Sequence, residues 1–550
     1  MIARADFPAQ LLARATSVGW DRWALGLFAL VLILILATFT DYGVTWDADA
    51  EAVYGQRVLD YYVSGFADLR YLSIYDLFYY GAAYELPVSA LNVLSPLGVF
   101  ETRHLSDALM GLAGIVGTWK LGRALAGPRA GFIAALFIAL TPNYYGQMFN
   151  NPKDIPFAAG IVWALYYLIR ILPELPRPNW RTVAKLGLVS GLAMGIRVGG
   201  FLIFGYAGLL LLLVAFWRGV ETRRAAPAVG LLWVATWRWF VPAFAIAYLV
   251  MIATWPWAQA APLTRPFQAL FYFSHEIFPW RTLFAGEYLP AADLPWTYLP
   301  VYIALALPEL VLVVLALAPL VLVSRWRQRD RDRVLGLFII GFAIAFPVAY
   351  AVAIKAVLFD GMRHFIFVLP PIAAFAAVIA DRLLDRLSQL SLRRFAYAGI
   401  ALYGIAHVGT MAMLHPDEYV YYNGFIGGVS GASGLFKLDY WANSYAEAAA
   451  ALESHLRAEY GADFMNQDFT IAVCGPQTSA AYYLPSNFIV VPNREDAQFF
   501  IAFTKDNCNK SVPGKEIYRV ERMGTLLSVV LDRRPILAEA ERSNRASVRP

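Results

Sequence analysis

Charged residues and cysteines are both scarce in this chain of 550 residues. Lysine, arginine, aspartate and glutamate together make up 15% of it, whereas hydrophobic residues make up 59%. A soluble protein of this length carries far more charge, so the composition excludes an ordinary soluble enzyme and predicts a membrane protein with several spans. The two cysteines, Cys474 and Cys508, are too few for a disulfide framework or a zinc-ribbon site. The net charge of +5 comes from basic residues in particular loops, so we expect no nucleic-acid partner.

Long hydrophobic runs are abundant instead. The first, "WALGLFALVLILILATFT", is too long for the core of a cleaved signal peptide, so we expect a retained first helix. Lysine and arginine are concentrated in alternate loops, and loops rich in these residues lie on the cytoplasmic side of a membrane. We therefore expect a multi-pass protein of the bacterial inner membrane, with a cytoplasmic N-terminus. About eleven runs could span a membrane, and they lie near 23–40, 104–120, 130–142, 156–173, 184–196, 199–217, 239–256, 298–323, 334–354, 365–380 and 395–413.

The composition changes to ordinary polarity from about residue 414. Strand-like runs appear there, such as "NFIVVP" and "TLLSVVLD". We predict a mainly helical transmembrane domain over 1–413, with its first outer loop at 41–103, and a small extracytoplasmic α/β domain over 414–550. The outer compartment of bacteria is oxidising, so Cys474 and Cys508 either form a disulfide or remain two separately buried thiols.

Three carboxylates follow the first hydrophobic run within five positions. They are Asp47, Asp49 and Glu51 in "TWDADAEAVYG", and the residues after them have the spacing of an amphipathic helix that lies at the membrane surface. Such carboxylates are either a solvated helix face or part of a site that needs a base. The spacing of Asp47 and Asp49 also allows a divalent cation, Mg²⁺ or Mn²⁺, shared with a phosphate, although two carboxylates alone are a weak signal.

Further polar residues are expected at the same outer face. "NNPKDIPF" places Lys153 beside Asp154 just before a span, "GLAMGIRVGG" places Arg197 at the end of another, and "DGMRHF" adds Arg363 and His364. Each has an ordinary explanation, since Asp154 can pair with Lys153 and cap a helix, and the other cations can anchor at the interface. Their convergence favours a site where cations hold a lipid phosphate and a carboxylate deprotonates a hydroxyl.

Several of these segments resemble a known family. The motifs "TWDADAEAVYG", "FETRHLSDALMGL", "NNPKDIPFA", "DGMRHFIFVLPP" and "YYNGFIGGVSGASGLFKLDYWANSYAEAA" are similar to parts of bacterial membrane glycosyltransferases with the GT-C fold. The relevant branch is related to protein O-mannosyltransferases and to the aminoarabinose transferase of lipid A, and is similar to glycosyltransferase family 39. The resemblance covers roughly residues 25–450.

The resemblance implies a reaction and a set of residues. A hexose or pentose would pass from a polyprenyl-phosphate donor, with inversion, to a lipid, glycan or protein acceptor at the outer face of the membrane. Asp47 would act as the base on the acceptor hydroxyl, and Asp154 would assist. The expected ligands of the lipid phosphate and the donor are Lys153, Arg197, Arg363, His364, Arg57 and Arg103.

One position departs from the family pattern. Ala48 stands where a glutamate usually follows the aspartate, so either Asp49 or Glu51 takes over that role, or the role is dispensable. Two other classes of function remain open. One is a transporter or flippase of a lipid-linked sugar, for which Glu309 after Pro308 is the best candidate residue. The other is a scaffold or sensor whose outer domain binds glycan and whose catalytic loop has decayed.

Overall fold

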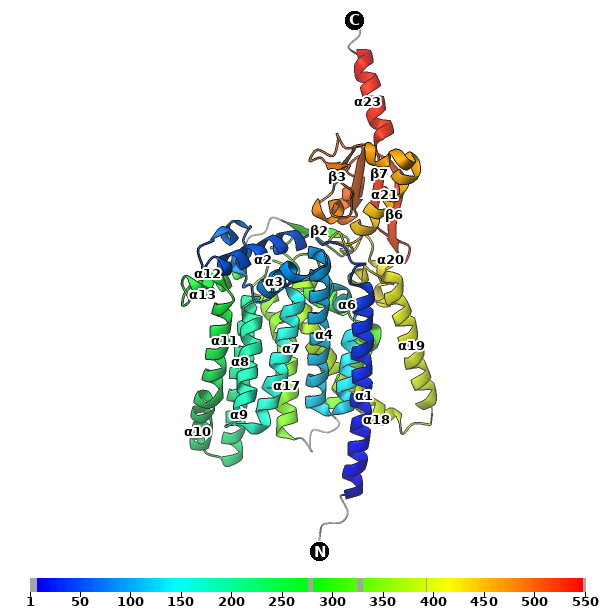
Figure 1. The fold of residues 1–550 in the computed structure, drawn as a ribbon. Coiled ribbons are helices and arrows are strands. Elements are labelled where there is room, and N and C mark those ends of the chain that lie inside the picture. Colours follow the sequence, from blue (N-terminus) through cyan, green and yellow to red (C-terminus); the bar gives the residue numbers. More distant parts are fainter. Residues whose placement is uncertain (1–6, 276–279, 324–329, 392, 548–550) are drawn as a thin grey trace.

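The protein consists of a helical membrane region with a small sheet above it (Figure 1). The computed structural model describes residues 7–275, 280–323, 330–391 and 393–547. Within these ranges, seven helices are long and apolar enough to cross a membrane, and an eighth span results if one sharply bent helix pair is counted as a single crossing.

The eleven predicted runs fall on helices of the membrane region, although the run near 298–323 is divided among three helices and no predicted run covers the helix at Ala225–Ala235. The helices are α1 (Phe7–Thr38), α4 (Val99–Ala126), α5 (Pro128–Ala139), α7 (Asp154–Ile171), α8 (Trp180–Met194), α9 (Leu202–Thr222), α10 (Ala225–Ala235), α11 (Val241–Ala253), α14 (Tyr298–Ala306), α15 (Glu309–Ala316), α16 (Ala318–Val323), α17 (Arg331–Ala353), α18 (Leu369–Leu387) and α19 (Arg393–Leu414). A π-helical turn at Thr236–Phe240 joins α10 to α11. Helices α5 and α8 have 12 and 15 residues, and α4 carries several charges, so the number of crossings stays a prediction.

The predicted run 298–323 is broken in the structure. Helices α14 and α15 meet at an angle of 116°. Pro308 stands at the break, where it lacks an amide hydrogen and forces Leu307 before it into an extended conformation. The sequence contained this signal, because a proline inside a hydrophobic run ends or bends a helix.

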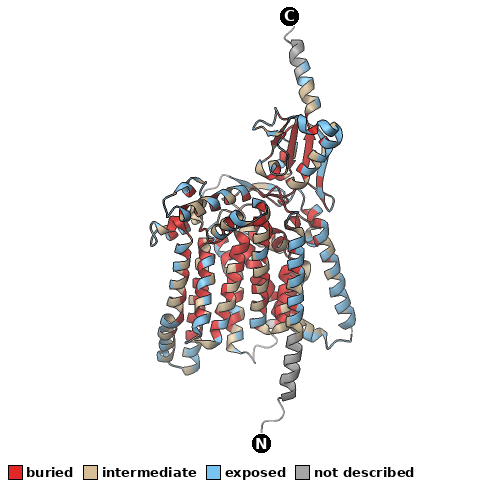
Figure 2. Ribbon diagram, viewed as in Figure 1, coloured by how far each residue is buried: buried red, intermediate tan, exposed pale blue. Residues whose placement is uncertain are grey.

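Burial separates the centre of the bundle from its rim (Figure 2). In α7 and in the span that contains α18, 72% and 83% of the membrane window is buried, whereas in α1 and α19 the value is 17%. The two central helices therefore pack against protein on most sides, and the two peripheral ones present most of their surface to lipid.

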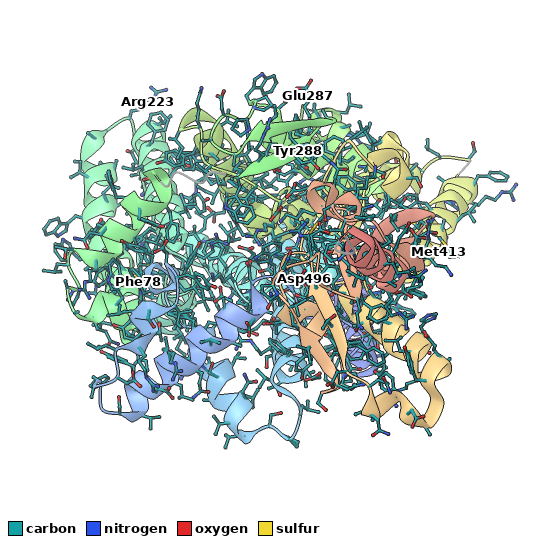
Figure 3. All side chains as sticks on the ribbon, turned by 90° about the horizontal axis from the view of Figure 1, so that it is seen from above. Phe78, Arg223, Glu287, Tyr288, Met413 and Asp496 are labelled. Carbon is teal, nitrogen blue, oxygen red and sulfur yellow. A yellow bond between two sulfur atoms is a disulfide. The ribbon has the colours of Figure 1, made fainter. Side chains whose placement is uncertain are left out.

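Shorter elements cover the top of the bundle. The predicted surface helix is α2 (Ala48–Val63), which packs against α3 (Glu85–Leu94). The remaining short elements are η1 (Arg70–Ser73), η2 (Leu77–Tyr79), α6 (Pro142–Gln147), η3 (Leu172–Glu174), η4 (Val198–Phe201), α12 (Pro256–Gln259), α13 (Arg265–His275), β1 (Arg281–Phe284), β2 (Glu287–Pro290), η7 (Arg363–Val368), η8 (Glu418–Val420), η9 (Gly424–Ile426) and α20 (Gly428–Ala432). The hairpin of β1 and β2 lies at the top of the helices, below the C-terminal sheet (Figure 1), and Glu287 and Tyr288 mark it in the view from above (Figure 3).

The C-terminal region forms a five-stranded mixed sheet in the order β4-β3-β5-β7-β6. Its elements are α21 (Tyr445–Tyr460), η10 (Gly461–Asn466), β3 (Phe469–Val473), α22 (Thr478–Ala481), β4 (Phe488–Val490), β5 (Phe499–Phe503), η11 (Lys505–Lys510), β6 (Lys515–Arg522), β7 (Thr525–Asp532) and α23 (Arg534–Ser547). Strand β3 pairs in parallel with β4 and β5, and β7 pairs antiparallel with β5 and β6. A disulfide joins Cys474, just after β3, to Cys508 in η11.

The buried side chains form two main clusters. The larger extends from the membrane helices through Trp441, and the cluster around the sheet begins at Ala442. Residues 419–441 therefore contribute side chains to the core of the helical region, although they follow its last long helix. The domain boundary at 413/414 stays a prediction.

His415 ties the first helix to the segment that follows the last one. Its Nε2 lies 3.0 Å from Oδ2 of Asp41, and its Nδ1 lies 2.9 Å from Oε1 of Glu418. The hydroxyl of Tyr42 also donates to Glu418. Burial alone would lower the pKa of His415, but Glu418 and then Asp41 outweigh it and raise the pKa to about 9.

We expect the melting temperature to fall as the pH rises through about 9 and His415 loses its proton. Because the pKa is raised in the folded state, the stabilisation is complete below the ordinary value of 6.5 and is lost above about 9. A shift of this size corresponds to roughly 3 kcal/mol, which partial exposure reduces to about 1–2 kcal/mol. Thermal unfolding of wild type and His415→Gln tests this: the variant should melt lower at a pH of about 6 and equally at about 10. An equal difference in melting temperature between wild type and the variant at both pH values would contradict the role given to protonated His415.

Candidate active site

Asp47 lies at the N-terminus of α2 and forms an ion pair with Arg363 at the start of η7. Oδ2 of Asp47 is 2.7 Å from Nη1 of Arg363. The Asp47 side chain keeps 42% of its surface exposed, so the ion pair does not bury it completely. Burial alone would raise the pKa of Asp47, but Arg363 and then Lys153 outweigh it and hold the pKa below its ordinary value. The carboxylate is therefore ionised at neutral pH and can act as a base.

Glu51 lies one helical turn after Asp47, on the same face of α2. Its side chain is only 1% exposed, and Oε1 forms an ion pair with Nζ of Lys153. The ammonium of Lys153 also lies 3.9 Å from the centroid of the Tyr80 ring, which is a cation–π contact. Among the described residues, none donates a hydrogen bond to the other carboxylate oxygen of Glu51.

Asp154 begins α7 and forms an ion pair with Arg197, which lies between α8 and η4. Asn151 orients this carboxylate, because its side-chain amide donates to Oδ2 of Asp154 at 3.1 Å and its Oδ1 accepts from the Asp154 amide at 2.9 Å. The ordinary explanation, in which Asp154 pairs with its neighbour Lys153, is wrong. Adjacent side chains at a helix start point in different directions, so each finds another partner.

Tyr80 lies between two of these cations. Its ring centroid is 5.6 Å from the guanidinium carbon of Arg197, in addition to the contact with Lys153. Gly81 makes this position possible, because any Cβ there would collide with the carbonyl group of Gly195. The amide of Ala83 donates to that same carbonyl at 3.0 Å and fixes the two segments to each other. We call Asp47, Glu51, Lys153, Asp154, Arg197 and Arg363 the charged cluster.

The other predicted residues lie outside the charged cluster or at its edge. Asp49 is exposed and accepts a hydrogen bond from Thr478 at 3.1 Å. Arg57 pairs with Asp60 on the surface of α2, and Arg103 pairs with buried Glu85. His364 follows Arg363 and lies against the ring of Phe359. Of the two candidates for the role that Ala48 leaves open, Glu51 is in the cluster and Asp49 is not.

Lys505 and Tyr80 are residues at the charged cluster that the sequence did not predict. Lys505 comes from the C-terminal region, yet its Nζ lies 3.3 Å from Asp360 and 4.8 Å from the centroid of the Trp46 ring, next to Asp47. No spacing in the sequence points to a residue so far along the chain. Tyr80 lies in the segment "YLSIYDLFYYGAAYELP", whose many tyrosines are typical of a membrane interface and do not predict a contact with these cations.

The side chains present do not fit the metal site that the spacing of Asp47 and Asp49 allowed. Asp47 pairs with Arg363, whereas Asp49 points to Thr478. Within the part of the chain that the structure describes, no group of three or more His, Cys, Asp or Glu side chains is placed to hold a metal ion. The positive charge beside each carboxylate of the charged cluster comes from lysine or arginine.

Fold and site together define a membrane protein with a cluster of opposed charges at one end of its helices. Residues 101–242 match the sequence model of the dolichyl-phosphate-mannose-protein mannosyltransferase family. An undecaprenyl phosphate-alpha-4-amino-4-deoxy-L-arabinose arabinosyl transferase of Pseudomonas savastanoi pv. phaseolicola is 25% identical over 325 residues, which are 58% of this chain and 53% of that protein. A second transferase of this name, from Pseudomonas fluorescens, is 26% identical over 231 residues, which are 42% of this chain and 36% of that protein.

The chain thus spans about half, or less, of the length of these curated relatives. Two solved structures are also similar. That of ArnT from Cupriavidus metallidurans bound to undecaprenyl phosphate has 15% identity and a TM-score of 0.48, covering 94% of this chain and 98% of that one. The second structure is that of the archaeal oligosaccharyltransferase AglB from Archaeoglobus fulgidus in complex with an inhibitory peptide and a dolichol-phosphate. It has 12% identity and a TM-score of 0.48, and the match covers 88% of this chain and 69% of that one. The sequence matches confirm the resemblance to membrane glycosyltransferases of the protein O-mannosyltransferase and aminoarabinose transferase type.

Proposed function

We propose that this protein transfers a sugar from a polyprenyl-phosphate donor to an acceptor at the outer face of a bacterial inner membrane. One observation carries the proposal: three pairs of a carboxylate and a cation lie close enough to interact at one end of the membrane helices, and Tyr80 contacts the cations of two of them. Buried charges at a membrane are costly and mark functional sites. The combination of a base with several cations suits transfer from a phosphate to a hydroxyl.

The cations of the charged cluster would hold the lipid phosphate. Arg363 and Arg197 each offer a planar fork of donors to phosphate oxygens, and Lys153 offers a point charge. In the free protein these cations are held by carboxylates, so phosphate binding competes with the existing ion pairs. When phosphate takes part of the charge of Arg363, the pKa of Asp47 rises and the carboxylate becomes a stronger base.

Asp47 would then take the proton of the acceptor hydroxyl. The hydroxyl oxygen attacks the anomeric carbon of the sugar from the face opposite the phosphate, the bond from that carbon to the phosphate oxygen breaks, and the configuration inverts. The lipid phosphate leaves with the bonding electron pair, and the neighbouring cations stabilise its charge. Asp154, oriented by Asn151 and Arg197, would position the acceptor.

The donor sugar is a pentose or a hexose. The curated relatives are named for undecaprenyl phosphate-linked 4-amino-4-deoxy-L-arabinose, and the family model for dolichyl-phosphate-mannose, so these two sugars on polyprenyl phosphate are the first donors to test. The acceptor is a lipid, a glycan or a protein. The distribution of positive loops supports a cytoplasmic N-terminus, with the charged cluster and the C-terminal domain outside.

Replacing Asp154 with asparagine should lower transfer by about 10–100-fold, because an assisting carboxylate contributes less than the base itself. The assay uses purified protein in lipid, radiolabelled polyprenyl-phosphate sugars and extracted bacterial envelope as acceptor. Asp60→Asn is the matched control, since Asp60 pairs with Arg57 and Arg70 on the surface of α2 and should leave transfer unchanged. Equal activity of Asp154→Asn and wild type would remove Asp154 from the mechanism.

The transport alternative depended on Glu309. This residue begins α15 at the bend of the broken helix pair, where it accepts hydrogen bonds from the hydroxyl of Tyr403 at 2.7 Å and from the amide of Gly424. These contacts attach both α19, which carries Tyr403, and the segment after it to α15. The carboxylate therefore has a structural explanation, and transport without transfer is retained as the result that would contradict the proposed function.

A further inference from the structure

Lys505 reaches from the C-terminal domain to the edge of the charged cluster. Its side chain is 6% exposed, and its ammonium lies 3.3 Å from Oδ1 of Asp360 and 3.3 Å from the carbonyl oxygen of Tyr440. It also lies 4.8 Å and 5.8 Å from the ring centroids of Trp46 and Trp280. A lysine is rarely buried to this degree unless a carboxylate or an aromatic face compensates its charge, and here both do.

Asp360 explains why this position matters to the cluster. Its carboxylate is 9% exposed and lies three residues before Arg363. Asp47 and Asp360 both interact electrostatically with Arg363, so they compete for one guanidinium. Lys505 neutralises Asp360, and Arg363 then forms its hydrogen-bonded ion pair with Asp47. Without Lys505, Asp360 would be a buried carboxylate that draws Arg363 toward itself.

Trp46 gives Lys505 a second connection to Asp47. The Trp46 ring packs against Phe503 of β5 and against Trp280, and a Cβ at Gly475 would collide with it. The Trp46 backbone amide donates to the carbonyl of Trp441 at 3.0 Å. The residue immediately before the proposed base is therefore held by Phe503 and Gly475 of the C-terminal domain as well as by the helical region, and movement of the loops of the C-terminal domain would move Asp47.

The turn that carries Lys505 is anchored on both sides. Asp506 and Asn507 have φ values of 53° and 58°, a left-handed region that aspartate and asparagine adopt more readily than other residues except glycine. Lys437 holds Asp506 with an ion pair of 2.7 Å. On the other side, Cys508 is bonded to Cys474 at the end of β3.

We infer that Lys505 is a positioning residue of the charged cluster, and that the Cys474–Cys508 disulfide fixes the turn that presents it. Lys505 acts through Asp360 and Trp46 on the Arg363–Asp47 pair and does not itself touch the reacting atoms. The inference rests on the proposed function for its kinetic consequences, and on the contacts of Lys505 alone for its structural ones.

The kinetic test compares Lys505→Met with Lys505→Arg. Lys505→Met should lower kcat for transfer about 10-fold and raise the donor KM by only about 2-fold, because Arg363 is the sole ion-pair partner of Asp47 in the charged cluster but one of three cations proposed to hold the phosphate. It should also move the acid limb of the pH–rate profile upward, since a cation near Asp47 is lost. Lys505→Arg should restore most of kcat, and Lys510→Met, an exposed lysine of the same turn, is the matched control. An unchanged pH profile in Lys505→Met would overturn the positioning role.

Hydrogen–deuterium exchange provides a readout that does not need transfer. In Lys505→Met, exchange should increase in residues 358–366 and 44–50 and remain as in wild type in the strands β3, β5 and β7. Unchanged exchange in both of the first two segments would overturn the inference. If wild type transfers no sugar at all, the proposed function fails, and this experiment alone decides the role of Lys505.

The disulfide is tested by reduction and by the Cys474→Ser/Cys508→Ser double variant. A phosphine reductant converts the disulfide to two thiols, and both treatments should lower kcat to about the level of Lys505→Met. Reducing the Lys505→Met protein should then have little further effect, because both changes disable the same turn. Fully additive losses would show that the disulfide acts independently of Lys505, and that part of the inference would be wrong. Melting curves of each variant identify loss of activity that comes from unfolding.

Discussion

Replacing Asp47 with asparagine should lower sugar transfer by about 10²–10⁴-fold, the usual contribution of a general base. Asparagine has nearly the same shape and still can accept a hydrogen bond from Arg363, but it cannot take a proton. Donor binding should stay within a few-fold of wild type, because the phosphate is held by cations. The measurement is the rate of label transfer together with equilibrium binding of the labelled donor.

Asp49→Asn is the control for this prediction. Asp49 lies two residues further on, is exposed, and hydrogen-bonds to Thr478 and not to any cation of the charged cluster. It should retain transfer within about 2-fold of wild type. A large loss of transfer in Asp49→Asn, together with normal transfer in Asp47→Asn, would show that Asp47 is not the base.

Replacing Lys153 with methionine should lower the free energy of unfolding by about 3–5 kcal/mol, the cost of leaving a buried charge without its partner. Glu51 is only 1% exposed, and Lys153 supplies its ion pair. Transfer should also be lost, because the lysine is one of three cations proposed to hold the phosphate. Thermal unfolding in lipid nanodiscs measures the first effect, and donor binding measures the second.

Two further variants separate stability from function at this pair. The double variant Lys153→Met/Glu51→Gln removes both charges, so it should regain most of the stability and none of the transfer. Arg57→Met, which breaks the exposed pair with Asp60, should cost at most about 1 kcal/mol. Recovery of transfer in the double variant would show that Lys153 serves Glu51 alone and does not bind the donor.

Local patterns in the sequence predicted much of the fold. The helical spacing after Asp47 predicted α2, and the run "TLLSVVLD" coincides with β7 (Thr525–Asp532). The predicted spans coincide with helical segments because a hydrophobic run is defined by neighbouring residues alone. Pro308 was the one local signal that was overlooked, and it breaks the predicted run 298–323.

The partners within the site were harder to predict. Lys153 and Asp154 are adjacent in sequence, yet each pairs with a distant residue, because pairing follows side-chain direction in three dimensions. Ala48 left two candidates for a second carboxylate, and only the helical phase of α2, which brings Glu51 to the same side as Asp47, separates them. Lys505 is separated from Asp47 by most of the chain and becomes a neighbour only once the C-terminal sheet packs onto the membrane helices.

The central question is whether sugar is transferred at the charged cluster or the lipid-linked sugar is only bound and moved. The most direct measurement uses proteoliposomes with labelled polyprenyl-phosphate sugar in the bilayer and acceptor outside, and it follows covalent label on the acceptor and movement of the donor between leaflets. Wild type should label the acceptor, and Asp47→Asn should bind the donor without labelling it. Donor that crosses the bilayer in both proteins while the acceptor stays unlabelled would contradict transfer and establish a carrier.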